Sequence, residues 1–162
     1  MILIALGANL PSPAGLPEAT LGKALERLPR EGITVRAASS YYRSEAWPDP
    51  DDPPFVNAVV RVETARDPAD LLATLKGIER AFGRTCGVRN APRPLDLDIL
   101  EYDGRVEAGP PVLPHPRLHE RGFVLIPLRD IEPDWRHPVL DRSVSQLIEA
   151  LPPEARALTR LA

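Results

Sequence analysis

Two aspartates separated by one residue carry the strongest chemical signal in this sequence. Asp96 and Asp98 lie in the run PLDLDIL (94–100), where carboxylates alternate with apolar residues. On a β-strand, residues two apart point to the same face, so the two carboxylates would stand side by side. Adjacent ionised carboxylates repel each other, whereas Mg²⁺ binds carboxylate oxygens together with substrate phosphates and water. A solvated strand face would explain the pattern too, but the residues around it favour one or two divalent cations.

An arginine-rich segment comes directly before the aspartates. Arg84, Arg89 and Arg93 lie among glycines and prolines between a predicted helix and the aspartate strand. A loop with so few apolar anchors is expected to move when a ligand binds. Arginines that reach a metal–phosphate centre can neutralise the charge that develops as a phosphoryl group is transferred.

Aromatic residues fall where a flat ligand could reach them. Trp47, Phe55 and Phe123 lie on loops or at loop edges. Phe55 shares a predicted strand face with Asn57, so a ring and an amide that both donates and accepts hydrogen bonds occur together. This combination suits a heterocycle, although ordinary packing at the edge of a sheet would also explain it. The sequence holds neither of the glycine-rich nucleotide loops G-x-x-x-x-G-K-[ST] and G-x-G-x-x-G, so a phosphate site must be built otherwise.

Strands and helices must position these groups. Continuous or alternating apolar residues predict four strands, at Met1–Leu6, Ile33–Arg43, Phe55–Glu63 and Leu95–Tyr102. Apolar residues at helical spacing predict a helix through Leu21–Leu28 that Gly32 ends. A second helix should begin at Asp67-Pro68, as N-cap and first helical residue, and end at Gly83.

The order βαββαβ is typical of the ferredoxin-like fold. We therefore predict an α+β protein with an antiparallel sheet and both helices on one face. The residues after Tyr102 would add a hairpin and short C-terminal helices, one of them starting at Ser143.

Composition limits the classes of function. The 162 residues suit a single domain over 1–162, and the net charge of −3 argues against a nucleic-acid partner. One cysteine allows no internal disulfide, and no apolar run is long enough to cross a membrane. We expect a cytoplasmic monomer that acts on small molecules.

Seven motifs together resemble a known family. They occur in order along most of the chain, as LGANL (6–10), SSYYRS (39–44), FVNA (55–58), GR (83–84), PRPLDLDI (92–99), PHP (114–116) and RGF (121–123). With them the chain resembles the 6-hydroxymethyl-7,8-dihydropterin pyrophosphokinases of folate biosynthesis. The resemblance implies transfer of the diphosphate of ATP to 6-hydroxymethyl-7,8-dihydropterin, with AMP as the second product.

The resemblance also implies roles for the residues that would bind ATP and metal. Asp96 and Asp98 would hold two Mg²⁺ ions that bridge the triphosphate. Arg84 and Arg93 would contact the transferring phosphates and act in catalysis with the aspartates. The nucleotide would also be bound by two further residues, His115 and Arg121.

A second set of residues would bind the pterin. Phe55 and Phe123 would sandwich its rings, and Asn57 would form hydrogen bonds with its edge. Ser44 and the backbone near Trp47 would complete this pocket. Glu79 resembles a supporting polar residue of the family, and the sequence does not define its role.

The chain departs from the family pattern at two places. Asn90-Ala91 stands where the family commonly has Trp-Gly, so a stacking residue of the expected lid is missing. Pro110 stands where some members carry a further nucleotide-binding arginine. Both changes concern lid closure and nucleotide affinity and leave the reaction class unchanged.

Two other functions remain open on the sequence alone. The aspartate pair could serve another Mg²⁺-dependent phosphotransferase or a hydrolase. A ferredoxin-like domain could also be a binding or regulatory module, because this fold carries many unrelated functions. Formation of AMP that depends on the pterin would separate these alternatives.

Overall fold

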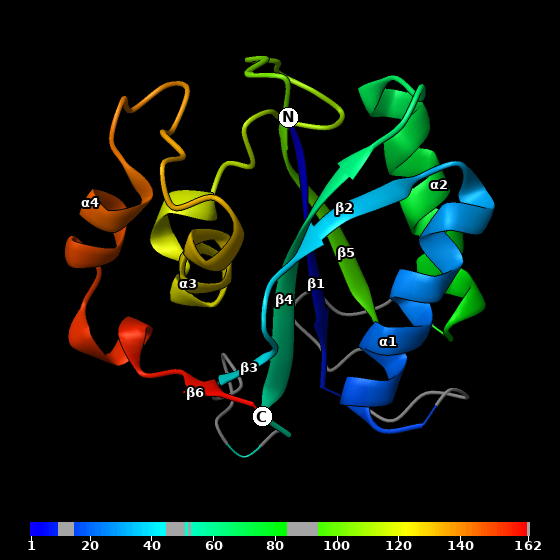
Figure 1. Ribbon diagram of the computed structural model, residues 1–162, viewed down its shortest axis with the longest axis horizontal. Helices are drawn as coiled ribbons and strands as arrows, with labels where there is room; N and C mark the ends of the chain where they lie inside the picture. The colour runs from blue at the N-terminus through cyan, green and yellow to red at the C-terminus, as the bar shows by residue number, and fades with distance from the viewer. Residues whose placement is uncertain (10–14, 45–50, 52, 84–93, 162) are drawn as a thin grey trace.

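An antiparallel sheet forms the centre of the computed structural model, which describes residues 1–9, 15–44, 51, 53–83 and 94–161 (Figure 1). The strand order is β5-β1-β4-β3-β6, and β2 also pairs with β4. The strands are β1 (Ile2–Ala8), β2 (Thr34–Ala38), β3 (Tyr42–Ser44), β4 (Phe55–Glu63), β5 (Asp96–Tyr102) and β6 (Thr159–Arg160). The predicted bounds of β4 are confirmed, and those of β1 and β5 are confirmed to within two residues.

Helices α1 (Pro17–Arg27) and α2 (Pro68–Ala81) lie together on one face of the sheet (Figure 1). The predicted cap of α2 is present, since Asp67 Oδ1 accepts the N–H of Asp70 at 2.8 Å. After α1 the chain makes one 3₁₀ turn and then reverses at Gly32, whose φ of +76° is readily adopted by glycine. The ferredoxin-like arrangement is therefore confirmed.

The second predicted strand was too long. Ile33–Arg43 divides into β2 and β3, and both parts pair with β4. Ser39 lies at the break, where its hydroxyl accepts the N–H of Val59 at 2.9 Å and donates to the carbonyl of Ser40 at 2.8 Å. The Ser39 N–H also donates to the carbonyl of Val59 at 2.9 Å, so Ser39 holds the chain against β4 between β2 and the point where pairing resumes at Tyr42.

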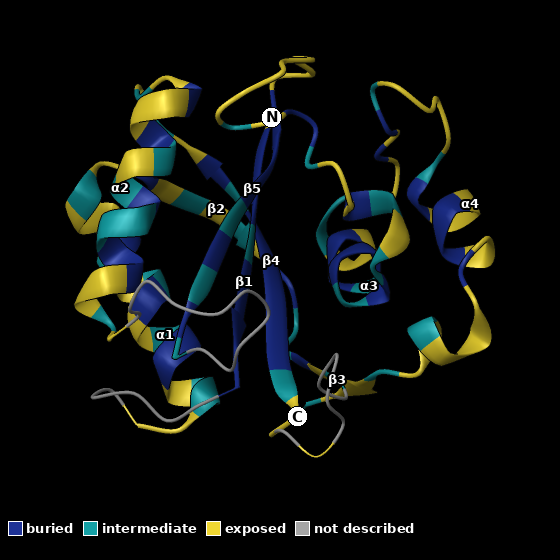
Figure 2. Ribbon diagram, turned by 180° about the vertical axis from the view of Figure 1, so that it is seen from behind, coloured by how far each residue is buried: buried dark blue, intermediate teal, exposed yellow. Residues whose placement is uncertain are grey.

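The other face of the sheet is covered as well. Helices α3 (Gly122–Ile131) and α4 (Val144–Glu149) lie across the sheet from α1 and α2, and the strands between the two layers are mostly buried (Figure 2). Leu3, Val59 and Leu100 pack under α3, whereas the alternate residues of the same strands pack under α1 and α2. The sequence indicated short helices here, but α3 itself was not predicted, because Pro127 lies in its interior and proline normally interrupts a helix.

The C-terminal additions follow the prediction in outline. The expected hairpin is a single antiparallel bridge between Glu107 and Leu113. Helix α4 begins after Ser143, whose hydroxyl accepts the N–H of Gln146 at 3.1 Å, while Gln146 Oε1 accepts the N–H of Ser143 at 2.9 Å. Among the described residues, no helix is long and apolar enough to cross a bilayer.

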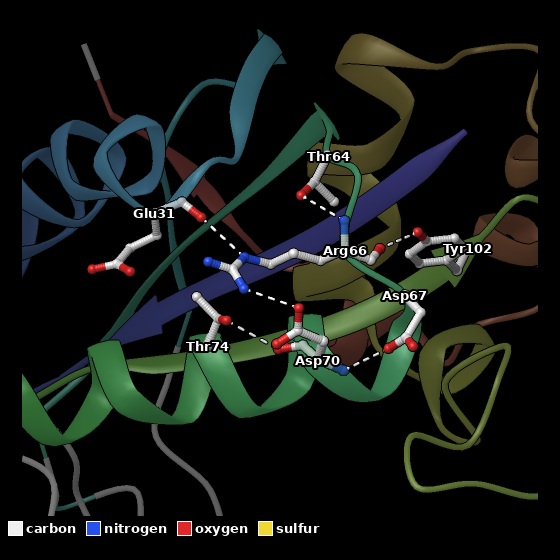
Figure 3. A network of polar contacts seen from close by, with 7 residues as sticks. All are labelled: Glu31, Thr64, Arg66, Asp67, Asp70, Thr74 and Tyr102. Carbon is white, nitrogen blue, oxygen red and sulfur yellow. Dashed lines mark hydrogen bonds and ion pairs between the residues drawn. The ribbon is translucent and has the colours of Figure 1, made fainter.

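A polar network fixes the end of β5 that lies farthest from the aspartates (Figure 3). The Arg66 guanidinium donates to the carbonyl of Glu31 at 3.0 Å and to the carboxylate of Asp70 at 2.9 Å. The hydroxyl of Tyr102, the last residue of β5, donates to the carbonyl of Arg66. The network joins the 3₁₀ turn after α1, the start of α2 and the end of β5, so it helps to set the position of the strand that carries the aspartates.

Candidate active site

The two aspartates and Asn57 lie on one face of the sheet, in two neighbouring rows. Gly7 on β1 pairs directly with Asp96 on one side and with Asn57 on the other. In the next row of that face, Ala5 pairs with Asp98. Directly paired residues of antiparallel strands point to the same face. Asp96, Asp98 and Asn57 therefore share the face that carries α3, and the small residues of β1 lie between them.

The two carboxylates raise each other's affinity for a positive charge. Burial, the charge of Asp96 and the charge of Glu79 raise the pKa of Asp98 to about 7, although Lys76 and Arg121 act in the opposite direction. The two side chains offer hard oxygen ligands, which suit Mg²⁺. No group of three or more His, Cys, Asp or Glu residues within the described part of the chain could hold a metal. The remaining ligands would therefore come from substrate oxygens and water, which is how Mg²⁺ is usually bound beside phosphates.

The structure gives Glu79 a defined position. Its side chain is buried on α2, and its Oε2 accepts the backbone N–H of Leu97, the residue between the two aspartates, at 2.7 Å. Lys76, one turn earlier, forms an ion pair with Glu79 at 3.2 Å. The sequence held a signal for this, because Glu79 lies four residues after Leu75 and so belongs to the apolar face of the helix. A carboxylate on that face therefore holds the strand that carries Asp96 and Asp98.

Cationic and neutral donors surround the carboxylates. Burial first, and then the charge of Arg121, lower the pKa of His115 to about 4, so its imidazole is neutral at physiological pH. His115 Nδ1 accepts the N–H of Arg117 at 3.2 Å, which assigns the ring proton to Nε2. Burial lowers the pKa of Arg121, but the charges of Asp98 and Asp96 oppose that shift. Lys76 acts electrostatically on both Asp98 and His115, and sequence reasoning had not included it in the site.

The residues predicted to bind the pterin come from adjacent elements. Phe55 and Ser44 are directly paired at the ends of β4 and β3, and Asn57 lies two residues along β4. Asn57 Nδ2 donates to Ser44 Oγ at 3.0 Å, which fixes the orientation of the amide. Phe123 lies in the first turn of α3, and the Arg121 guanidinium lies 5.4 Å from the centre of its ring. One aromatic residue is therefore placed on the sheet and the other on the helix that covers this face.

Some predicted residues cannot be placed. Trp47, Arg84 and Arg93 lie outside the described residues, as does the expected lid loop Arg84–Arg93 with Asn90 in it. Pro110 is described, and it lines a cavity of about 320 Å³ together with Asp67, Pro68, Ala69, Arg105, Glu107 and Gly109. That cavity lies at the start of α2, whereas Glu79 near the end of α2 reaches the aspartates, so Pro110 lies away from the carboxylate pair.

Gly7 leaves room for the Asn57 amide, and we expect Gly7→Ala to weaken pterin binding. A Cβ at position 7 would lie 3.0 Å from Asn57 Oδ1, and Ser44 holds that amide in place. We expect the pterin KM to rise about fivefold, which corresponds to roughly 1 kcal/mol of overpacking. Gly77→Ala is the matched control, because the nearest atom to its new Cβ would be the flexible end of Arg80 at 3.8 Å. Equal pterin KM values for the two variants would show that Gly7 does not shape the pocket.

Comparison with known proteins identifies the family of this chain. A family model described as 7,8-dihydro-6-hydroxymethylpterin-pyrophosphokinase matches residues 3–133. The chain belongs to this family. The resemblance seen in the sequence motifs is thereby confirmed, and the matched segment contains every residue proposed above for the site.

Two bacterial relatives carry the name 2-amino-4-hydroxy-6-hydroxymethyldihydropteridine pyrophosphokinase. The protein of Pseudomonas aeruginosa is 40% identical over 152 residues, which are 93% of this chain and 91% of that protein. The protein of Synechocystis is 42% identical over 119 residues, which are 73% of this chain and 60% of that protein.

Longer proteins match over part of their length. The mitochondrial folate synthesis bifunctional protein of Arabidopsis thaliana is 44% identical over 131 residues, which are 80% of this chain and 23% of that protein. The crystal structure of Plasmodium falciparum HPPK-DHPS matches with a TM-score of 0.67 at 16% identity, over 90% of this chain and 43% of that one. At that identity the structural match supports the fold alone.

Proposed function

We propose that this chain transfers the diphosphate of ATP to 6-hydroxymethyl-7,8-dihydropterin. The hydroxymethyl oxygen would form a bond to the β-phosphorus of ATP, and the bond from that phosphorus to the α,β-bridging oxygen would break. AMP would leave with the electron pair of the broken bond, and the hydroxyl would lose its proton. The observation that carries the proposal is the carboxylate pair, which shares one sheet face with Asn57 in a member of this family.

The phosphate half of the reaction would take place beside β5. Asp96 and Asp98 would hold two Mg²⁺ ions, which when bound would neutralise phosphate charge and orient the triphosphate. The Arg121 cation acts electrostatically on both carboxylates, so it would face a phosphate bound between them. Neutral His115 would donate a hydrogen bond from Nε2 to the nucleotide, and Lys76 would add a second positive charge.

Two further arginines belong to the proposal on the family resemblance. Arg84 and Arg93 would contact the transferring phosphates, where guanidinium groups match the planar oxygens of phosphate. Both lie outside the described residues. Their expected contribution is to stabilise charge in the transition state, so Arg93→Ala should lower kcat more than it weakens ATP binding.

The pterin half would lie over β4 and β3. Asn57 would present its amide to the edge of the pterin, with its orientation set by Ser44. Phe55 and Phe123 would enclose the rings from the sheet and from α3, and the backbone near Trp47 would complete the pocket. ATP and the pterin are thus the proposed partners, and we propose that residues 1–162 act as one domain.

Phe123→Ala is expected to weaken pterin binding about fivefold or more. Loss of ring stacking should cost on the order of 1 kcal/mol, and ATP affinity should change little. Ile126→Ala on the same helix is the matched control, because Ile126 is also partly buried against the core under α3. Titration calorimetry with the pterin measures the effect, and an unchanged affinity would remove Phe123 from the pocket.

The direct test is an assay of AMP, ADP and phosphate with and without the pterin and Mg²⁺. The proposal requires AMP that forms only when ATP, the pterin and Mg²⁺ are all present. ADP as the nucleotide product would indicate transfer of a single phosphoryl group. Phosphate or diphosphate released without the pterin would indicate a hydrolase built on the same aspartates.

A further inference from the structure

We infer that the hydrogen bond between Tyr42 and Asp130 is a positioning contact, which fixes β3 and α3 relative to each other on the two sides of the proposed pterin pocket. This inference rests on the proposed function. Tyr42 lies on β3 and Asp130 lies near the end of α3, so the contact joins the two elements that carry opposite sides of the pocket. Neither residue would touch the pterin or the reacting atoms in the proposed arrangement.

The contact is specific and well placed. The Tyr42 hydroxyl lies 2.9 and 2.8 Å from the two carboxylate oxygens of Asp130, and the same carboxylate accepts the N–H of Ser40 at 3.3 Å. Tyr42 is only 7% exposed. Burial and the hydrogen bond to Asp130 both raise the pKa of Tyr42, so the hydroxyl keeps its proton and donates it. One side chain of α3 therefore holds the backbone just before β3 and the side chain of the first residue of β3.

On the sheet side, Tyr42 lies next to the residues that are proposed to bind the pterin. It pairs with Asn57, and two residues later Ser44 pairs with Phe55. Ser44 also accepts the hydrogen bond that orients the Asn57 amide. Because β3 has only three residues, a shift at Tyr42 would move Ser44 and release Asn57.

On the helix side, Asp130 shares α3 with Phe123. The helix spans ten residues, and Phe123 lies in its first turn while Asp130 lies in its last. Pro127 leaves one backbone hydrogen bond of this helix unmade, but Val124, Leu125 and Leu128 pack α3 into the core along its length, so a displacement of one end is transmitted to the other. The Tyr42–Asp130 contact would therefore fix the spacing between Phe123 and the residues of β3 and β4.

The chain offers a matched control at the same end of α3. Glu132, at the C-cap of the helix, forms an ion pair with Arg61 of β4. That ion pair also joins the helix to the sheet, but Arg61 pairs with Leu3 and Ala37, away from Ser44 and Asn57. Loss of this ion pair should affect stability without moving the pocket.

The kinetic experiment compares Tyr42→Phe, Asp130→Ala, which leaves no acceptor for the Tyr42 hydroxyl, the double variant and Glu132→Gln with the wild-type chain. We expect the pterin KM to rise roughly three- to tenfold for both single variants, with the ATP KM and kcat within twofold of wild type. The double variant should be no worse than Asp130→Ala alone, because each substitution removes the same hydrogen bond between Tyr42 and Asp130. Glu132→Gln should leave the pterin KM unchanged. Equal rises in both KM values, additive effects, or a Glu132→Gln variant with the same pterin defect would overturn the inference.

A second measurement needs no turnover. The chemical shifts of the Asn57 side-chain amide should change in NMR spectra of Tyr42→Phe and Asp130→Ala and stay unchanged in Glu132→Gln. If these chemical shifts are unchanged in all three variants, the inference is wrong, whatever the KM values of the variants are. If wild-type protein forms no pterin-dependent AMP but these chemical shifts change as expected, the proposed function fails and the positioning contact stands.

Discussion

Asp98→Ala is expected to abolish diphosphate transfer and leave the protein folded. Asp98 faces the same way as Asp96 beside the small residues of β1 and belongs to neither core cluster, so in the proposed function its carboxylate would serve a bound cation. Loss of a metal ligand removes several kcal/mol of charge stabilisation in the transition state, so turnover should fall by about a thousandfold or more. The substitution also removes a negative charge that Asp96 repels, so the metal-free variant should unfold at the same temperature as wild type or a higher one.

The measurement is AMP formation as a function of Mg²⁺ concentration, with thermal unfolding in EDTA recorded in parallel. Chelation of Mg²⁺ should abolish AMP formation by the wild-type enzyme too, and added Mg²⁺ should restore AMP formation by the wild type but not by Asp98→Ala. Glu63→Gln is a suitable control, because it removes one carboxylate from an exposed ion pair with Arg36 at the far end of β4. Full turnover by Asp98→Ala at ordinary Mg²⁺ concentrations would refute the assignment of the metal site.

The parts of the fold that the sequence predicted are those encoded by local patterns. The alternation of apolar and polar residues predicted both ends of β4 correctly, and Asp67 with Pro68 predicted the start of α2. The same alternation placed Asp96 and Asp98 on one face of β5, and the pairing with β1 confirms that placement. These features depend on residues close in the chain, so a single sequence is enough to reveal them.

The features that were missed depend on contacts between distant segments. Helix α3 contains Pro127, and its burial between the sheet and α4 outweighs the local cost of a proline. The break between β2 and β3 needs the Ser39 hydroxyl to reach Val59 on another strand. The proximity of Lys76 to the aspartates follows from how α2 packs on β5, which periodicity along the helix does not show. The roles of individual site residues in binding ATP and pterin remain predictions.

Glu79→Ala is expected to destabilise the protein and to raise its requirement for Mg²⁺. The buried carboxylate accepts the N–H of Leu97, and without it that amide loses its acceptor in a site with little water. A buried donor left without a partner costs about 1–3 kcal/mol of unfolding free energy. Lys76 loses its ion pair too, but it is partly exposed and can turn to solvent, so it adds little to that cost.

The functional effect follows from where Leu97 lies. Its amide is the backbone link between Asp96 and Asp98, so release of that amide loosens the spacing of the two carboxylates that would hold the metal ions. Small errors in the spacing of a reacting site can cost about a hundredfold in rate. We therefore expect the Mg²⁺ concentration for half-maximal AMP formation to rise at least tenfold, with a loss of kcat that excess Mg²⁺ only partly restores.

Glu79→Gln separates the hydrogen bond from the charge. Glutamine keeps an oxygen that can accept the Leu97 N–H, so its unfolding temperature and Mg²⁺ requirement should lie much closer to wild type than those of Glu79→Ala. It also removes one of the charges that raise the pKa of Asp98, so any remaining effect on Mg²⁺ binding reports the charge alone. Thermal unfolding in EDTA and Mg²⁺ titration of AMP formation measure both quantities for the two variants. If alanine and glutamine at position 79 lower Mg²⁺ affinity equally, the charge and not the hydrogen bond supports the site. If neither changes it, Glu79 serves the fold alone.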